Sequence, residues 1–146
     1  MPAPGERIDP LGNFNFLLEI DGVTRASFAE VTGGDSTIDV TEYREGGDLL
    51  TPRKLPAMTK HGNIVLKFGT TPDLELWEWH KAAVRGEVER KNGSIVALDR
   101  RGQPAARWNF VQAWPSKYDM PDWNAEGNDV AVESIELVHE GFERVS

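Results

Sequence analysis

The sequence predicts a mainly β protein, an antiparallel β-barrel or sandwich of about seven strands with one α-helix packed on it. The first observation is a series of short segments in which apolar and polar residues alternate, separated by turn signals rich in glycine, asparagine and proline. The second is a single segment with helical spacing, at about residues 72–85. The third is an alternating stretch at 107–114, in which Trp108, Phe110 and Trp114 are expected on one face.

The expected strands are bounded by residues that favour turns or interrupt a hydrogen-bonded ladder. Asp21-Gly22 is typical of a two-residue hairpin turn, and Asn92-Gly93 is interpreted in the same way. Pro115 is expected to end the sixth strand, because proline has no N–H to donate. The last strand has apolar residues on both faces, so it is either buried on both sides or interrupted by a bulge. The expected ranges are 13–20, 23–28, 36–44, 62–69, 94–99, 107–114 and 130–139.

The expected helix has start and stop signals at both ends. Thr71 can serve as N-cap, Pro72 suits the first helical position, and Gly86 suits the C-terminal stop. Two adjoining apolar stripes run along it, one formed by Leu74, Trp77 and Val84 and the other by Leu76, Trp79 and Ala83. We expect the combined face to pack on the sheet as a major part of the core.

Length and composition favour one domain over residues 1–146, with a flexible arm at 1–12 that is rich in proline and glycine. The absence of cysteine agrees with folding in a reducing cytoplasm. The net charge of −8 disfavours binding to nucleic acid and anchoring to an anionic membrane. No apolar run approaches the roughly 20 residues of a spanning helix, and the first residues lack the apolar core of a signal peptide.

No pattern in the sequence selects a catalytic, metal or cofactor site. His61, His80 and His139 are not in a metal-ligand spacing, and each is more often a surface or packing residue. Asp35, Asp39 and Glu42 lack the spacing of an EF-hand loop, so a solvated strand face is favoured over calcium binding, and the aromatic residues are more often core than ligand pocket. No nucleophile elbow, phosphate-binding loop or dinucleotide fingerprint occurs. We therefore predict no enzymatic activity and no cofactor.

The segment 45–60 differs from the segments around it. It combines paired glycines and two prolines with several apolar residues, in the order EGGDLLTPRKLPAMTK. This composition is too broken for a strand and too apolar for an ordinary exposed loop, so we expect an extended loop. The composition alone leaves open whether it packs on its own barrel or on another subunit.

Several segments together resemble one known family across nearly the whole chain and in the same order. They are DPLGNFNFLLEIDG, VTEYREGGD, RKLPA followed by KHGNIVLKFG, DLELWEWH, RWNFVQAWPSKY and GNDVAVESIELVHEGFE. The chain is similar to the tail-tube proteins of contractile phage tails and to the inner-tube proteins of extracellular contractile injection systems. Departures are small: Ala57 stands where glycine is expected, and a basic residue is expected near Phe68.

The resemblance implies a β-barrel with a flanking helix that forms hexameric rings, which stack into a hollow tube inside a contractile sheath. The tube conducts DNA or effector proteins when the sheath contracts. The implied partners are further copies of the chain, the sheath protein, baseplate or spike proteins and a cap. The subunit is expected to assemble in the bacterial cytoplasm and to be part of a phage virion or phage-tail-like particle. The tube of type VI secretion is a more distant relative with the same architecture.

The candidate site residues are therefore those of assembly rather than of catalysis. Inter-subunit candidates are Arg44, Glu45, Leu49, Leu50, Pro52, Arg53, Lys54, Leu55 and Met58. Lumen candidates are Asp35, Thr37, Asp39 and Thr41, for which an ordinary outer surface is the alternative. The alternative function, from another class, is a monomeric soluble β-barrel that binds a small apolar ligand.

Overall fold

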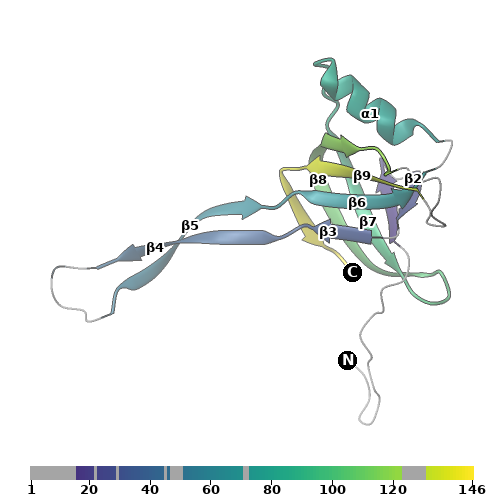
Figure 1. Ribbon diagram of the computed structural model, residues 1–146. Coiled ribbons are helices and arrows are strands. Elements are labelled where there is room, and N and C mark those ends of the chain that lie inside the picture. Colours follow the sequence, from purple (N-terminus) through teal and green to yellow (C-terminus); the bar gives the residue numbers. More distant parts are fainter. Residues whose placement is uncertain are drawn as a thin grey trace, which may run out of the picture.

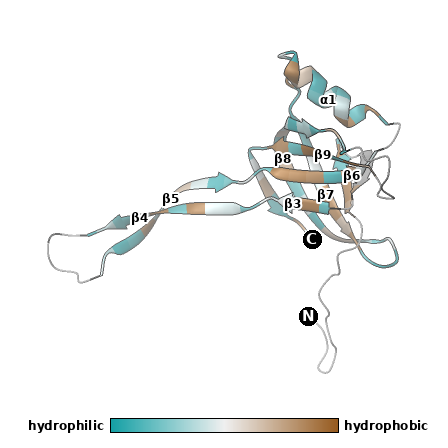
Figure 2. Ribbon diagram, in the orientation of Figure 1, coloured by the Kyte–Doolittle hydropathy of each residue, from teal (hydrophilic) through white to brown (hydrophobic). Residues whose placement is uncertain are grey.

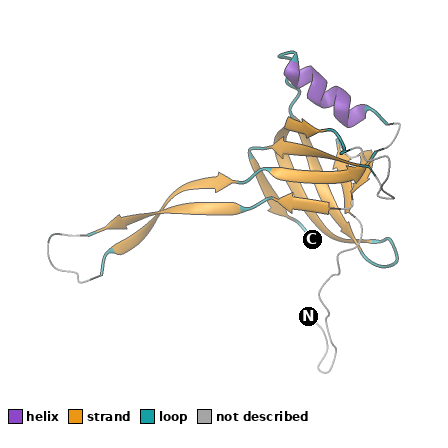
Figure 3. Cartoon of the chain, in the orientation of Figure 1, coloured by secondary structure: helices purple, strands orange, loops and turns teal. Residues whose placement is uncertain are grey.

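The computed structural model describes residues 16–21, 23–28, 30–44, 46, 51–70, 73–122 and 131–146. The expectations for the 1–12 arm and for Glu45, Leu49, Leu50, Thr71 and Pro72 lie outside these ranges. The described residues form ten strands and one helix (Figures 1 and 3). In chain order these are β1 (Phe16–Ile20), β2 (Val23–Phe28), β3 (Glu30–Gly33), β4 (Ser36–Tyr43), β5 (Arg53–His61), β6 (Ile64–Gly69), α1 (Glu75–Val84), β7 (Lys91–Leu98), β8 (Pro104–Asp119), β9 (Val132–Val138) and β10 (Gly141–Arg144).

The body is an antiparallel sandwich whose two layers share strand β8. The first half of β8 pairs with β7 and β10, and its second half pairs with β9. One layer is therefore β2-β1-β7-β8-β10 and the other is β8-β9-β6-β3. The strands β2 and β3 end the hydrogen-bonded path on either side, so hydrogen bonds do not close the sheet into a barrel. The sandwich form of the prediction is the one that the structure confirms.

The core lies between the layers and under the helix. Leu18 of β1, Leu66 of β6 and Ile135 of β9 are fully buried, and Phe28 meets Phe68 edge to face with ring centroids 5.4 Å apart. Each fully buried leucine or phenylalanine contributes roughly 2–3 kcal/mol by removal from water. The alternation in β1 and β6 thus places one face of each strand in a shared core.

Strand β8 is longer than expected and changes face midway. It continues through Pro115 to Asp119, so the expectation that Pro115 ends the strand is wrong. The pairing with β9 shifts register between Pro115 and Lys117, and a bulge is a position at which a strand tolerates proline. Gln112 has a φ of 53°, which breaks the alternation, so Phe110 and Ala113 are both buried. Trp108 lines a cavity between the layers together with Phe110, so these two do share a face, whereas Trp114 follows the break at Gln112 and is half-buried against the core.

Asn92-Gly93 is not a turn but part of β7, contrary to the sequence expectation. The register shifts between Lys91 and Gly93, which makes this a bulge. A Cβ atom on Gly93 would lie 2.6 Å from the carbonyl oxygen of Glu19 and 2.6 Å from the Phe110 ring. The glycine is needed because two neighbouring strands and an aromatic ring approach closely, a reason unrelated to turn formation.

The last part of the chain contains two strands where one was expected. In β9, Ile135 and Leu137 face the core, and the ladder to β6 runs without a shift, so the bulge lies in the partner strand β8. After a short break β10 pairs with the first half of β8. The strands β10 and β3, each four residues long, carry too little alternation to be recognised from sequence.

Helix α1 lies across one end of the sandwich and begins later than predicted (Figure 1). Its N-cap position is Leu74, and the Asp73 carboxylate accepts a hydrogen bond from the Glu75 N–H. Gly86, at a φ of 85°, follows its C-terminus as expected. Only the stripe of Leu76 and Trp79 is buried. The stripe of Leu74, Trp77 and Val84 is 57%, 39% and 71% exposed, so its expected place in the core is wrong.

Among the described residues, no helix combines the length and the apolar character needed to cross a membrane.

Candidate assembly surface

A two-stranded hairpin formed by β4 and β5 projects from one side of the body (Figure 1). Only Asp39 and His61 of these strands are half-buried, and the other side chains are exposed. The expectation of a loop over 45–60 is therefore wrong for 53–60, which lie in a strand. Pro56 pairs with Val40 next to a register shift. Among the described strands β5 pairs with β4 alone, and proline is tolerated in such a strand because its other edge has no ladder to which an N–H must donate.

The hairpin is a continuation of the body strands β3 and β6. Between them, Gly34 N donates to Asn63 O over 3.0 Å and Gly62 N donates to Asp35 O over 2.8 Å. Gly33 and Gly34 have φ values of 78° and 67°, a conformation that glycine adopts most readily. A side chain at Gly33 would also overlap the carbonyl group of Asn63. The paired glycines thus stand where the ladder passes from the body into the hairpin.

His139 contacts both the base of the hairpin and the start of β10. Its Nε2 lies 2.8 Å from Gly62 O, and its Nδ1 lies 3.1 Å from Gly141 N. A carbonyl can only accept and a backbone N–H can only donate, so in these contacts Nε2 donates to Gly62 and Nδ1 accepts from Gly141. The His61 ring packs edge to face on Phe142 with centroids 5.6 Å apart. These contacts make the base of the hairpin an ordered junction.

The hairpin presents apolar side chains that no described part of the chain covers. Val40 and Met58 are 61% and 69% exposed, and the hydropathy colouring shows hydrophobic positions along both strands (Figure 2). The exposed apolar side chains of the hairpin are Ile38, Val40, Tyr43, Leu55 and Met58. Such a group on a projecting element is typical of an interaction surface.

The structure places the predicted inter-subunit residues on or beside this hairpin. The described ones are Arg44, Pro52, Arg53, Lys54, Leu55 and Met58, of which Pro52 is half-buried and the others are exposed. Sequence reasoning missed Ile38, Val40 and Tyr43, because their alternation is equally typical of a strand inside the body. The missing information is that, among the described strands, β4 pairs with β5 alone.

Three of the four lumen candidates share one face of β4. Thr37, Asp39 and Thr41 are alternate residues of the strand, and Asp39 forms an ion pair with Lys60 of β5 at 3.0 Å. Asp35 lies before β4 at the base of the hairpin. The four residues therefore follow one line from the body outward.

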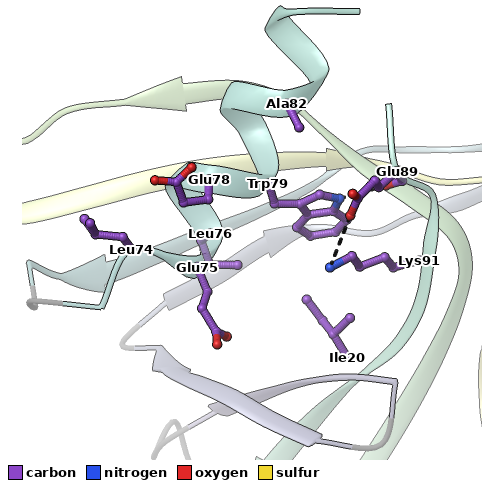
Figure 4. Close-up of a pocket in the computed structure, with 9 residues that line it drawn as sticks. All are labelled: Ile20, Leu74, Glu75, Leu76, Glu78, Trp79, Ala82, Glu89 and Lys91. Atoms are coloured by element: carbon purple, nitrogen blue, oxygen red, sulfur yellow. Dashed lines mark hydrogen bonds and ion pairs between the residues drawn. The ribbon is translucent and has the colours of Figure 1, made fainter. Parts of the chain in front are cut away.

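A second candidate surface is an open cavity of about 430 Å³ between α1 and the ends of β1 and β7 (Figure 4). Trp79 forms its inner wall, and its Nε1 donates to the carbonyl oxygen of Glu89 over 2.7 Å. Lys91 lies 5.4 Å from the centre of the Trp79 ring and 3.8 Å from the Glu89 carboxylate. We call this cavity the α1 groove, and its lining residues are Ile20, Leu74, Glu75, Leu76, Glu78, Trp79, Ala82, Glu89 and Lys91.

A smaller cavity of about 280 Å³ lies between the layers, beside the base of the hairpin. Its lining is mainly apolar and aromatic, and includes Phe16 of β1, Trp108 of β8 and Phe142 of β10. Gly33 and Gly34 form part of its rim. It is the feature closest to the predicted alternative of a small apolar ligand.

Tyr118 packs under the exposed side of α1. Burial, followed by the hydrogen bond and negative charge of Glu133, raises its pKa to about 12. The hydroxyl donates to Glu133, and the Trp77 ring lies 5.0 Å away. These contacts join the helix to β8 and β9. Within the described ranges, no three His, Asp or Glu side chains are grouped so that they could hold a metal ion.

The sequence profile of one protein family matches most of the chain. The family is described as T4-like virus tail tube protein gp19, and the match covers residues 12–143. No curated protein sequence matches the chain.

Several solved structures are similar to this chain. A chain of the extended sheath-tube complex of the extracellular contractile injection system PVC is 27% identical, with a TM-score of 0.82, covering 94% of this chain and 92% of that one. A chain of the tube-terminating cap of the anti-feeding prophage is 25% identical, with a TM-score of 0.82, covering 100% and 99%. Hcp1 from Flavobacterium johnsoniae is 19% identical, with a TM-score of 0.56, covering 90% and 94%, and shares the fold.

Proposed function

The chain belongs to the T4-like virus tail tube protein gp19 family, and on this premise we propose that it is the repeating subunit of the inner tube of a contractile injection machine. Six copies would form a ring, and rings would stack into a hollow tube. The likeness to a chain of a sheath-tube complex supports this role.

The observation that carries the proposal is the projecting hairpin with its exposed apolar side chains. Ile38, Val40 and Met58 are each more than half exposed in the single chain. A heterologous contact, in which a projection of one copy meets a different surface of the next, generates rings and filaments. The hairpin gives the chain such a projection, and assembly would remove its apolar groups from water.

Stacking of rings would be strongly cooperative. A contact contributing about 2 kcal/mol per subunit, repeated six times between two rings, would give about 12 kcal/mol, which corresponds to roughly nanomolar affinity before ordering costs. Weak individual contacts would therefore produce a stable tube.

We further propose the partners and cargo that the family resemblance implies. The tube would contact a sheath, a baseplate or spike, and a cap, and would conduct DNA or effector proteins. It would be assembled in the bacterial cytoplasm as part of a phage virion or phage-tail-like particle, with a structural rather than catalytic role.

We propose that one face of β4 and the residue before it face the lumen of the tube. These residues are Asp35, Thr37, Asp39 and Thr41. Carboxylates there would repel DNA or acidic cargo and keep it from adhering. Reversing Asp35 and Asp39 to lysine should slow cargo passage while tubes still assemble. If tubes of this variant deliver cargo at an unchanged rate, these residues do not line the lumen.

A monomeric ligand-binding protein is the second candidate, supported by the apolar lining of the 280 Å³ cavity. It predicts a monomer that takes up a small apolar compound in this cavity. The exposed hairpin favours the tube, because ligand binding between the layers would leave Val40 and Met58 in water.

Negative-stain microscopy and light scattering of the purified protein test the proposal. The sample is examined alone and then with its sheath and baseplate proteins. Rings or tubes with a central hole and six subunits are expected in at least the second case. A monomer in both cases would contradict the proposal and direct attention to the inner cavity.

A further inference from the structure

Strand β5 is the cationic side of the hairpin. From Arg53 to His61 it carries three lysine or arginine residues and no carboxylate, in a chain whose net charge is −8. Arg53 and Lys54 are exposed, as are the apolar Leu55 and Met58, whereas Lys60 forms an ion pair with Asp39 of β4. A surface that fits β5 must therefore combine negative charge with apolar contact.

The α1 groove has this combination. Among its described lining residues are three carboxylates, those of Glu75, Glu78 and Glu89, and one ammonium group, that of Lys91, which forms an ion pair with Glu89. Between the charged groups the wall is apolar, with the buried Leu76 and Trp79, and Leu74 is 57% exposed at the mouth (Figure 4). The formal charge of the described lining residues is thus −2, from three negative groups and one positive group.

The groove and the hairpin lie at opposite sides of the body. Strand β6 begins at Ile64, next to the hairpin base, and ends at Gly69, shortly before α1. Its six residues span about 20 Å. Figure 1 shows the hairpin leaving on one side and the first turn of α1 on the other. A head-to-tail contact between identical chains requires this separation, since each copy must offer a projection and a receptor at the same time.

We propose that the α1 groove receives the β5 side of the hairpin of a second copy of the chain. This inference rests on the proposed function and names the surface on which the hairpin docks. Met58 or Leu55 would cover Leu74 and the wall beside Trp79. Lys54 and Arg53 would approach the carboxylate of Glu78. Complementary charge of this kind sets register and orientation as well as affinity.

Charge reversal tests the electrostatic half of the proposal. Glu78→Lys and Lys54→Glu are each expected to lower the yield of tubes about tenfold at low salt, because each places like charges together. The double variant restores an opposite-charge pair and should recover most of the yield. Glu87→Lys, an exposed residue outside the groove lining, makes the same charge change and should have little effect. All variants are first shown to be folded. If the double variant loses as much tube yield as each single variant, Lys54 and Glu78 do not pair between copies.

Cross-linking tests the contact itself, because the chain has no cysteine of its own. Met58→Cys combined with Leu74→Cys places one exposed thiol on the hairpin and one at the groove. In assembled tubes a short bismaleimide should join most chains into covalent multimers. The control pairs Met58→Cys with Val111→Cys, an exposed site in β8, and should give few multimers.

The two proposals fail in different ways in this experiment. Tubes that form normally but give no more multimers than the control would overturn the groove as the receptor and leave the tube function standing. Failure of the unmodified chain to form tubes with its sheath and baseplate proteins would contradict the proposed function, and the inference with it.

Discussion

The side-chain oxygen of Asn92 accepts a hydrogen bond from the backbone N–H of Gln112 over 3.0 Å. Gln112 has a φ of 53° and marks the point at which β8 turns from one layer into the other. The carbonyl oxygen of Asn92 also accepts a hydrogen bond from the N–H of Asp21 over 3.2 Å. One asparagine in a bulge of β7 therefore contacts both the corner strand and the first hairpin turn.

Replacing Asn92 by alanine should destabilise the fold by about 1 kcal/mol, since one side-chain acceptor is lost where water can partly replace it. Gln112→Gly should leave stability unchanged or raise it, because glycine adopts a positive φ without strain. Denaturant unfolding of both variants measures the effects. A loss of several kcal/mol in Gln112→Gly would show that the Gln112 side chain, rather than its backbone, holds the corner.

The Asn92-Gly93 pair also shows what limited the prediction. As a local signal it is typical of a hairpin turn, and the same kind of signal at 21–22 does stand between two paired strands, with Ile20 of β1 opposite Val23 of β2. At position 93 the close approach of Phe110 decides the outcome, and Phe110 is distant in sequence. Local alternation was sufficient for β1, β4 and β6, but it left the faces of β9 undecided, and the positions of bulges, which depend on partner strands, were not predictable.

Gly93→Ala should destabilise the fold by about 2–4 kcal/mol, because the new methyl group would overlap Glu19 O and the Phe110 ring. Gly46→Ala is the matched control, since nothing lies within 4 Å of its added Cβ atom. Thermal unfolding of the two variants measures the difference. Equal unfolding temperatures of the two variants would mean that β1 and β8 can move apart at this point without a loss of stability.

His139→Ala should loosen the hairpin without unfolding the body. The variant loses the hydrogen bonds to Gly62 and Gly141, each contributing about 1 kcal/mol. Hydrogen exchange of amides in β4 and β5 should become about tenfold faster or more, while that of β7 stays unchanged. His80→Ala, which removes a contact with Pro115 under α1, is the control and should not change exchange in the hairpin.

Tyr118 should stay protonated until about pH 12. In an unfolded chain tyrosine ionises near pH 10, so the raised pKa adds stability that is complete below about pH 10 and is lost as the pH rises to about 12. Ultraviolet titration of a Tyr43→Phe variant observes Tyr118 alone, since the chain has two tyrosines. Glu133→Gln should lower the midpoint, and a midpoint near 10 before that substitution would contradict the Tyr118–Glu133 contact.

The assembly surface was predicted less completely than the fold. Its composition made residues 45–60 unusual, and Arg53, Lys54, Leu55 and Met58 do lie on the exposed hairpin. The sequence could not show that β4 leaves the body with β5, because an outward strand and a core strand alternate alike. For the same reason the two stripes of α1 looked equivalent, although only the stripe of Leu76 and Trp79 is buried.

The central claim is that the exposed apolar side chains of the hairpin form contacts between subunits that are needed for tube assembly. The most direct measurement is the fraction of protein in tubes, by sedimentation and electron microscopy, for the combined variant Ile38→Thr, Val40→Thr and Leu55→Thr. Threonine keeps the strand preference but removes apolar surface, so tube yield should fall more than about tenfold while monomer stability changes by about 0.5 kcal/mol per site or less. Val111→Thr, at an exposed site outside the hairpin, should assemble normally. Tubes of normal yield and length from the hairpin variant would contradict the account.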